Sequence, residues 1–232
     1  EKRLNESDYN VILFGAGSCG KTSIAGALLK NIVGNISPTI GTTKKIICYK
    51  ITIPLLKRKI NIIDTPGLFE ATAEGQNKER NTIQKAAKSD LIIFVVDQDL
   101  NKYELYLIKE LSKIGKHIII VLNKCDLRSS FQNKMIREKI FELTRNFPQK
   151  FKIIETIASP QSKLPDQPIT SRKLINVDNL FNEIINILEK EGEELIADNI
   201  LLQCNKLGYL SKNIINKQRK NLSKNIINKY SW

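Results

Sequence analysis

Short runs of apolar residues recur along the chain and predict the strands of a buried sheet. They are rich in Ile and Val, and they lie at residues 9–14, 91–97, 117–123 and 151–157. Runs of this length and composition are typical of strands with both faces covered. Segments with helical character alternate with them, at residues 22–30, 77–88, 101–114, 132–145 and 177–190. Strands that alternate with helices indicate a parallel sheet with helices on both faces.

One pair of segments departs from this alternation. Residues 44–53 and 59–64 are both rich in Ile, and Pro54 separates them. A short turn of this kind joins antiparallel strands. The predicted fold class is therefore α/β, with a mostly parallel sheet and one antiparallel strand. In such sheets ligands bind beyond the carboxyl ends of the strands, where the sequence places Gly15, Asp64, Asp97, Asn123 and Ala158.

The first candidate site follows the first predicted strand, where residues 15–22 read GAGSCGKT. This stretch fits the phosphate-loop pattern G-x-x-x-x-G-K-[ST], whose backbone N–H groups curl around an anionic diphosphate. In this pattern Lys21 reaches the outer phosphates and Thr22 ligates Mg²⁺. The predicted nucleotide-binding residues of the loop are Gly15, Ala16, Gly17, Ser18, Cys19, Gly20, Lys21 and Thr22.

The second candidate site is Asn123-Lys124-Cys125-Asp126. A carboxylate such as that of Asp126 accepts hydrogen bonds from the ring and exocyclic N–H groups of guanine, which adenine does not present. With the phosphate loop, this motif predicts GTP as the ligand. A dinucleotide-binding loop is the alternative, but it requires an acidic residue about 20 positions further on, and residues 31–63 contain no Asp or Glu.

Residues 64–67 read DTPG and follow the strand predicted beside the phosphate loop. The Asp64 carboxylate is expected to contact Mg²⁺ through water, and the Gly67 N–H is expected to meet the γ-phosphate. The loop between residues 33 and 43 must bring a hydroxyl group to the metal. A Gly-Thr-Thr sequence at 41–43 favours Thr43, and Thr39 is the alternative. The predicted metal ligands are Thr22, Thr43 and Asp64, and the predicted catalytic residues are Lys21, Thr43 and Gly67.

Leu68 stands where many small GTPases place the glutamine that orients the attacking water. A leucine cannot orient water, so we expect slow hydrolysis unless another group supplies this function. Ser18 is a candidate contact for a monovalent cation. His117, the single histidine, opens a buried strand and is expected to be structural. Asp97 and Asp99 are expected to cap the helix that follows them.

The chain of 232 residues carries a net charge of +13, and the charge is uneven. Residues 199–232 contain seven Lys or Arg and no acidic residue. The octapeptide LSKNIINK occurs at 210–217 and again at 222–229. We therefore predict a GTP-binding domain at residues 1–190 and a long, basic amphipathic helical extension at 191–232.

Several function classes are disfavoured by composition. No run of 18 apolar residues occurs, and the beginning of the chain lacks the layout of a signal peptide. The four Cys residues show no C-x-x-C pairing, which favours a reducing compartment. The chain begins without Met, so we expect it to be a segment of a longer protein.

With these motifs the chain resembles the translation-factor-related GTPases of the Era/TrmE group. GAGSCGKT, GTT, DTPGL and NKCD occur in that order, and the resemblance covers roughly residues 9–190. DTPGLFEA, residues 89–127 and the stretch EGEELIADNILLQCNKLG look more narrowly like Era-like proteins of cyanobacteria and plastids that continue into a hydrophobic helical domain. This resemblance implies a P-loop NTPase fold with a Ras-like G domain, GTP and GDP binding with Mg²⁺, slow hydrolysis and a nucleotide-controlled switch. It also implies a location in the cytoplasm or the plastid stroma.

The chain departs from the Era/TrmE pattern at two places. Ser18 stands where the group commonly has Asn, which bears on activation by a monovalent cation. The usual S-A-K motif that supports guanine is reduced to Ile157-Ala158-Ser159, so only Ala158 is carried over to the nucleotide site.

Two functions compete for this chain. The first is a GTPase switch whose basic tail packs on the GTPase domain or on a following domain, or contacts an anionic membrane. The second is a GTPase of ribosome or RNA assembly that uses the tail for RNA. The Era RNA module carries a G-x-x-G clamp, and only Gly192 and Gly208 follow residue 190, so RNA is the less favoured partner.

Overall fold

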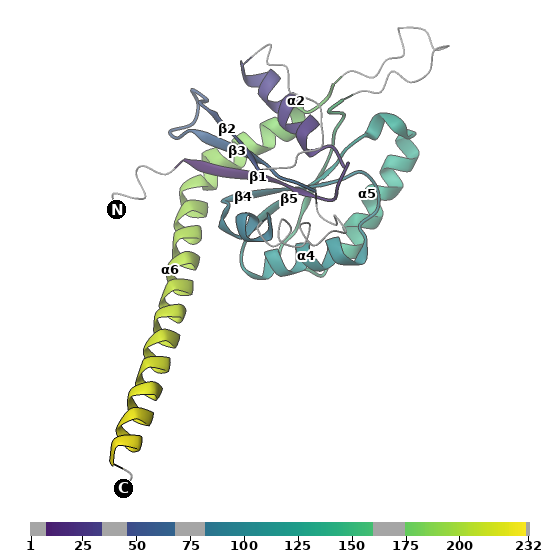
Figure 1. The fold of residues 1–232 in the computed structure, drawn as a ribbon. Coiled ribbons are helices and arrows are strands. Elements are labelled where there is room, and N and C mark those ends of the chain that lie inside the picture. Colours follow the sequence, from purple (N-terminus) through teal and green to yellow (C-terminus); the bar gives the residue numbers. More distant parts are fainter. Residues whose placement is uncertain (1–7, 34–45, 68–81, 160–174, 231–232) are drawn as a thin grey trace.

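The computed structural model describes residues 8–33, 46–67, 82–159 and 175–230. Its centre is a six-stranded sheet in the order β2-β3-β1-β4-β5-β6 (Figure 1). The strands are β1 (Tyr9–Gly15), β2 (Ile47–Ile51), β3 (Ile60–Asp64), β4 (Leu91–Val96), β5 (His117–Leu122) and β6 (Lys152–Glu155). β2 and β3 pair antiparallel, and the other neighbouring strands pair parallel. The predicted α/β fold with one antiparallel strand is confirmed.

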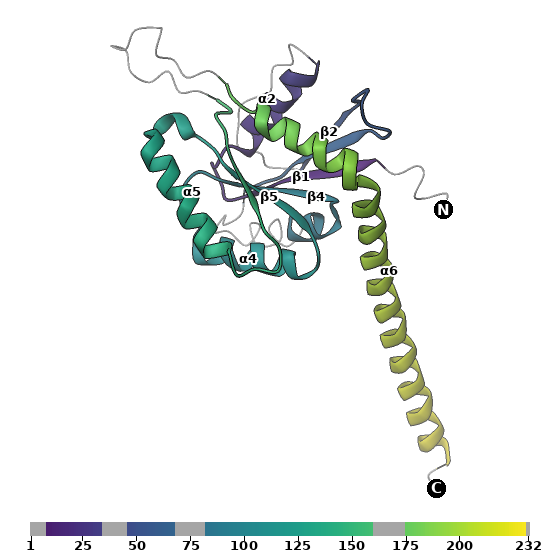
Figure 2. The same cartoon turned by 180° about the vertical axis from the view of Figure 1, so that it is seen from behind.

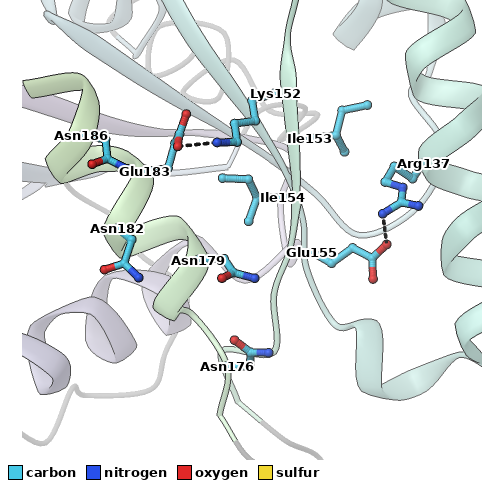
Figure 3. A pocket seen from close by; sticks show the side chains of 10 residues that line it. All are labelled: Arg137, Lys152, Ile153, Ile154, Glu155, Asn176, Asn179, Asn182, Glu183 and Asn186. Carbon is cyan, nitrogen blue, oxygen red and sulfur yellow. Dashed lines mark hydrogen bonds and ion pairs between the residues drawn. The ribbon is translucent and has the colours of Figure 1, made fainter. Parts of the chain in front are cut away.

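Helices cover both faces of this sheet, as Figures 1 and 2 show. One face carries α2 (Lys21–Val33) and α6 (Asp178–Tyr230), and the other carries α4 (Lys102–Lys113), α5 (Ser130–Thr144) and the helical residues 82–88. The alternation of side chains along a strand divides the core in two. In β1, Val11 and Leu13 join the core beneath α2 and α6, while Ile12 and Phe14 join the core beneath α4 and α5.

The cap of α4 differs from the sequence prediction. Asn101 is the N-cap, and its side chain accepts a hydrogen bond from the Glu104 N–H at 2.9 Å. The Glu104 carboxylate in turn accepts from the Asn101 N–H at 3.0 Å. Asp97 and Asp99 instead form ion pairs with lysines. The prediction that these two aspartates cap the helix is therefore wrong, because the capping box satisfies the first turn without them.

α6 is one continuous helix of 53 residues. The helix predicted at 177–190 thus continues into the predicted basic extension, and the domain boundary at residue 190 stays a prediction. Ile184, Leu188 and Ile196 of this helix are buried against the sheet. The later part of α6 extends away from the sheet as an arm (Figures 1 and 2). Within the described ranges, no helix has both the length and the apolar character needed to cross a membrane.

A buried polar network joins α6 to the amino ends of β4 and β5. Asn199 Nδ2 donates hydrogen bonds to Lys88 O at 2.6 Å and to Asp90 Oδ1 at 2.9 Å. Lys116 Nζ donates to Asn199 Oδ1 at 3.0 Å and to Ser89 O at 2.9 Å. The side chains of Asp90, Lys116 and Asn199 are all buried. Because buried charges must be paired and hydrogen-bonded, this network specifies where α6 crosses the edge of the sheet.

One ion pair and one contact between a histidine and a glutamate also join α6 to the sheet region. Arg58 Nε donates to Glu193 Oε1 at 2.7 Å, and Arg58 Nη2 donates to Glu193 Oε2 at 2.5 Å. His117 Nδ1 lies 3.5 Å from Glu191 Oε2. His117 is thus at the amino edge of the sheet and contacts α6, which agrees with its expected structural role.

Candidate functional site

The phosphate loop connects the end of β1 to the first turn of α2, so its backbone leads directly into a helix N-terminus. Such a terminus carries unpaired N–H groups and a partial positive charge, which suit an anion. Gly20 lies in the left-handed region with φ of 98°. A Cβ atom at this position would come within 2.2 Å of Asn123 Nδ2. Glycine is therefore required here by both conformation and contact.

The Lys21 side chain folds back over the loop. Its Nζ donates hydrogen bonds to Ala16 O at 2.5 Å and to Gly15 O at 3.1 Å. Only 6% of the residue is exposed. Since the ammonium group lies against the loop backbone, its charge is placed where the sequence predicts the outer phosphates.

Thr22 and Asp64 bring two oxygen ligands together at the end of β3. The Thr22 hydroxyl donates to Asp64 Oδ2 at 2.7 Å. Hydroxyl and carboxylate oxygens suit Mg²⁺, which binds to proteins through a few such ligands and keeps water and phosphate oxygens in its other positions. The residues present therefore fit the predicted metal. Thr43 and the alternative Thr39 lie outside the described residues.

The DTPG segment approaches the phosphate loop closely. The buried Thr65 hydroxyl donates to Leu13 O at 2.7 Å, which fixes the segment to β1. A Cβ atom on Gly67 would lie 2.5 Å from Gly17 Cα. Only glycine allows this approach, so Gly67 lies beside the loop as its predicted role requires. Leu68 lies outside the described residues.

Asn123 links three segments of the predicted site. Its Nδ2 donates to Cys19 O in the phosphate loop at 3.0 Å. Its Oδ1 accepts from the Thr156 hydroxyl at 3.1 Å and from the Ala158 N–H at 3.3 Å. The phosphate loop, the NKCD motif and the segment after β6 therefore meet at one buried amide.

Lys124 and Asp126 occupy a tight turn after β5. Lys124 has a left-handed φ of 58°, and its Nζ donates to Asp97 Oδ2 at 2.6 Å. Asp126 lies in the single 3₁₀ turn η1 (Cys125–Leu127) and is partly exposed. Asp97 thus holds the motif lysine, a role that the sequence alone does not reveal.

Sequence reasoning missed three polar residues behind the motif. They are Arg128, Asn133 and Thr156, which bond to the backbone or side chains of the NKCD motif. Arg128 is one cation among 37 in the chain, so its position carries no distinctive signal. Asn133 is an amide on the buried face of α5, and a polar residue among apolar helix positions is the one available signal.

The two motif thiols are chemically quiet. Burial raises the pKa of the Cys19 thiol, and burial likewise raises the pKa of the Cys125 thiol. Because the thiolate is the reactive form, neither residue is primed for oxidation. No group of three or more metal-binding His, Cys, Asp or Glu residues occurs in the described part of the chain.

Residues 10–124 match the sequence model of the family described as 50S ribosome-binding GTPase. The chain carries a P-loop GTPase domain of the Era, Der and MnmE type. GTPase Der of Campylobacter jejuni is 31% identical over 143 residues, which is 61% of this chain and 29% of that protein. The tRNA modification GTPase MnmE of Mesoplasma florum is 28% identical over 216 residues, which is 91% of this chain and 45% of that protein. The matched part of this chain thus spans less than half the length of either relative.

Solved structures show the same fold. Era of Aquifex aeolicus bound to GDP and AlF4⁻ superposes with a TM-score of 0.55 at 23% identity, over 76% of this chain and 56% of that one. Toc33 of Arabidopsis thaliana gives 0.52 at 17% identity, over 80% of this chain and 86% of that one. At these identities the likeness concerns the P-loop GTPase fold alone.

Proposed function

We propose that this chain is a guanine-nucleotide switch that binds GTP and GDP with Mg²⁺ and hydrolyses GTP slowly. The observation that carries the proposal is the Asn123 amide, which ties the base-selecting motif to the phosphate loop at Cys19. The contact between Thr22 and Asp64 adds the metal side of the same site. A site with phosphate, metal and base elements at one sheet edge suits a nucleoside triphosphate better than a smaller anion.

Each residue then has a distinct role. Lys21 and the loop N–H groups would neutralise the phosphates, and Thr22 and Asp64 would hold Mg²⁺ directly or through water. The metal, when bound, supplies charge stabilisation at the β- and γ-phosphate oxygens. Asp126 would select guanine. We further propose that Thr43 completes the metal site and that Ser18 faces a monovalent cation.

Hydrolysis should be slow in isolation. Leu68 carries no group that can orient the attacking water, so this position does not make that contribution to catalysis. GTPases without a stimulating partner turn over at roughly 0.01 s⁻¹ or less, and we expect a rate on this scale. A fast rate in dilute monomer that does not depend on a monovalent cation would contradict the assignment of Leu68.

Nucleotide titration tests the proposed specificity. Calorimetry with GTP, GDP and ATP should show a strong preference for the guanine nucleotides. Asp126→Asn should lose this preference and gain affinity for xanthine nucleotides, because the amide reverses the hydrogen-bonding pattern at the base. Equal affinities of the wild type for ATP and GTP would rule out a guanine-specific site.

A GTPase of ribosome or RNA assembly is the second candidate function. It is favoured by the basic composition of residues 199–232 and by the description of the matching family. Contact of this tail with an anionic membrane is the alternative use of the same charges. Salt-sensitive binding to RNA but not to anionic vesicles would favour the assembly function.

We also propose that the chain is related most narrowly to the Era-like GTPases of cyanobacteria and plastids, in the cytoplasm or the plastid stroma. The supporting observation is the presence of the sequence stretches DTPGLFEA and EGEELIADNILLQCNKLG. Sequencing of the reading frame on both sides of these residues tests this, and a hydrophobic helical domain after Trp232 is the expected result.

A further inference from the structure

The Arg128 guanidinium lies among three acceptors behind the NKCD motif. Nη1 donates to Asp97 O at 2.6 Å, Nη2 donates to Asn123 O at 3.0 Å, and Nε donates to Asn133 Oδ1 at 2.9 Å. Asp97 follows β4 and Asn123 follows β5, so one planar side chain joins the carboxyl ends of two neighbouring strands. Asn133 adds the first turns of α5 to this group.

Asn133 continues the same set of contacts toward the turn that holds Asp126. It is 4% exposed, and its Nδ2 donates to Cys125 O at 2.9 Å. On the other side, the Cys125 N–H donates to Thr156 O at 3.2 Å. The peptide groups immediately before Asp126 are therefore fixed from two directions, and both contacts come from outside the motif.

The local backbone needs such support. Asp126 sits in a 3₁₀ turn of only three residues, and Lys124 before it has a left-handed φ of 58°. A single 3₁₀ turn has few hydrogen bonds of its own, and a left-handed non-glycine residue persists only where its surroundings hold it. Arginine suits this position because its guanidinium presents several donors in one rigid plane.

We propose that Arg128 and Asn133 are positioning residues for guanine recognition, which act by holding the turn that carries Asp126. The inference rests on the proposed guanine specificity and adds to it two residues outside the NKCD motif. The alternative is a purely structural role, in which the contacts of Arg128 and Asn133 only stabilise the fold. The two roles differ in how the base is discriminated, because only a displaced Asp126 carboxylate changes the preference among purines.

Comparison of GDP with IDP isolates that preference. Guanine offers Asp126 a ring N–H and an exocyclic N–H, whereas hypoxanthine offers the ring N–H alone. The ratio of the two affinities therefore reports the geometry at the carboxylate, while phosphate and metal contacts cancel. In Arg128→Gln we expect the ratio to fall by about tenfold, the scale of one hydrogen bond to a charged group. Arg128→Lys keeps the charge but not the planar set of donors. Its ratio of GDP to IDP affinity should lie between those of the wild type and Arg128→Gln.

Asn133→Asp provides a second variant that preserves volume and the acceptor for Arg128. It lacks the amide donor to Cys125 O, so the GDP to IDP ratio should fall here as well. Arg58→Gln is the matched control, since the Arg58 guanidinium likewise donates hydrogen bonds, here to Glu193, but lies before the amino end of β3, at the opposite end of the strands. Its ratio should equal that of the wild type.

The outcomes separate the two proposals. If the wild type has no preference for guanine nucleotides, the proposed function fails, whatever the variants do. If the wild type has that preference and folded Arg128→Gln and Asn133→Asp keep the wild-type ratio, the positioning role is overturned. Circular dichroism establishes folding, and should Arg128→Gln not fold, Arg128→Lys and Asn133→Asp decide the question in the same way.

Discussion

Lys21 is the residue on which we expect the proposed phosphate binding to depend most directly. Its ammonium group already lies against the carbonyls of Gly15 and Ala16, so little reorganisation is needed when an anion enters the loop. Thr22 is similarly placed, with its hydroxyl 2.7 Å from Asp64 Oδ2. Preorganisation of this kind lowers the cost of binding, because the side chains have lost their freedom on folding.

Substitution of Lys21 and of Thr22 should therefore separate the contribution of the lysine charge to GTP affinity from the contribution of Mg²⁺. Lys21→Ala should weaken GTP binding roughly 10- to 100-fold, since it removes hydrogen bonds from a charged group. Thr22→Ala should weaken binding mainly when Mg²⁺ is present. Fluorescent-nucleotide titration with and without Mg²⁺ measures both, with the exposed Lys30→Ala of the same helix as the control. An equal loss in Thr22→Ala without Mg²⁺ would argue against its role as a metal ligand.

At the scale of elements, the strands and the motif residues at their ends could be predicted, whereas the course of α6 could not. Apolar runs such as residues 91–97 identify a buried strand because both faces of a parallel sheet are covered. The phosphate loop and NKCD have fixed spacings within the motif itself. By contrast, the role of Arg128 depends on Asp97 and Asn133, and contacts between distant segments leave no local pattern. The basic composition of residues 199–232 and the repeat within them favour a boundary near residue 190, yet Ile196 and Asn199 beyond that point are buried.

The contribution of this part of α6 to the free energy of unfolding can be measured at Asn199. Asn199→Ala would leave Lys116 and Asp90 without their shared amide in a buried setting, so the unfolding free energy should fall by about 1–3 kcal/mol. Urea unfolding measures the change. Asn205→Ala, at an exposed position of the same helix, should change stability by no more than a few tenths of a kcal/mol. Equal effects of the two substitutions would mean that the network does not hold α6.

The same network should make stability depend on pH. Burial raises the pKa of Asp90 above its usual value of 3.8, and the hydrogen bonds from Asn10 and Asn199 only partly oppose this. Between the unfolded and the folded pKa the native state binds more protons, so stability contributed by Asp90 falls as pH rises above 3.8. The unfolding free energy of the wild type minus that of Asp90→Asn should therefore decrease over this range. A difference that increases with pH would contradict the raised pKa.

For the whole molecule, α6 carries the basic segment away from the GTPase domain rather than back onto it (Figures 1 and 2). A second domain, an anionic membrane or RNA can therefore meet this segment. We expect co-sedimentation of the chain with anionic vesicles at low salt, because each cation near such a surface contributes about 1 kcal/mol. Replacement of Lys212, Lys217, Lys220 and Lys224 by Gln should abolish it, and the same replacement of Lys85, Lys88, Lys134 and Lys150 on the GTPase domain should not. Absence of binding at low salt would remove the membrane from the partners considered.

The length of α6 also determines how far its tip moves when its base rotates. With a rise of about 1.5 Å per residue, the part of the helix after Asn199 extends for roughly 45 Å. A lever of this length converts a rotation of about 5° at its base into a displacement of roughly 4 Å at its tip. The helix is anchored near this base, where Asn199 Nδ2 donates to the carbonyl of Lys88 at 2.6 Å, so a rotation about this anchor is the motion that the arm would magnify. The arm would then amplify a rearrangement of ångström size into one that a distant partner can detect.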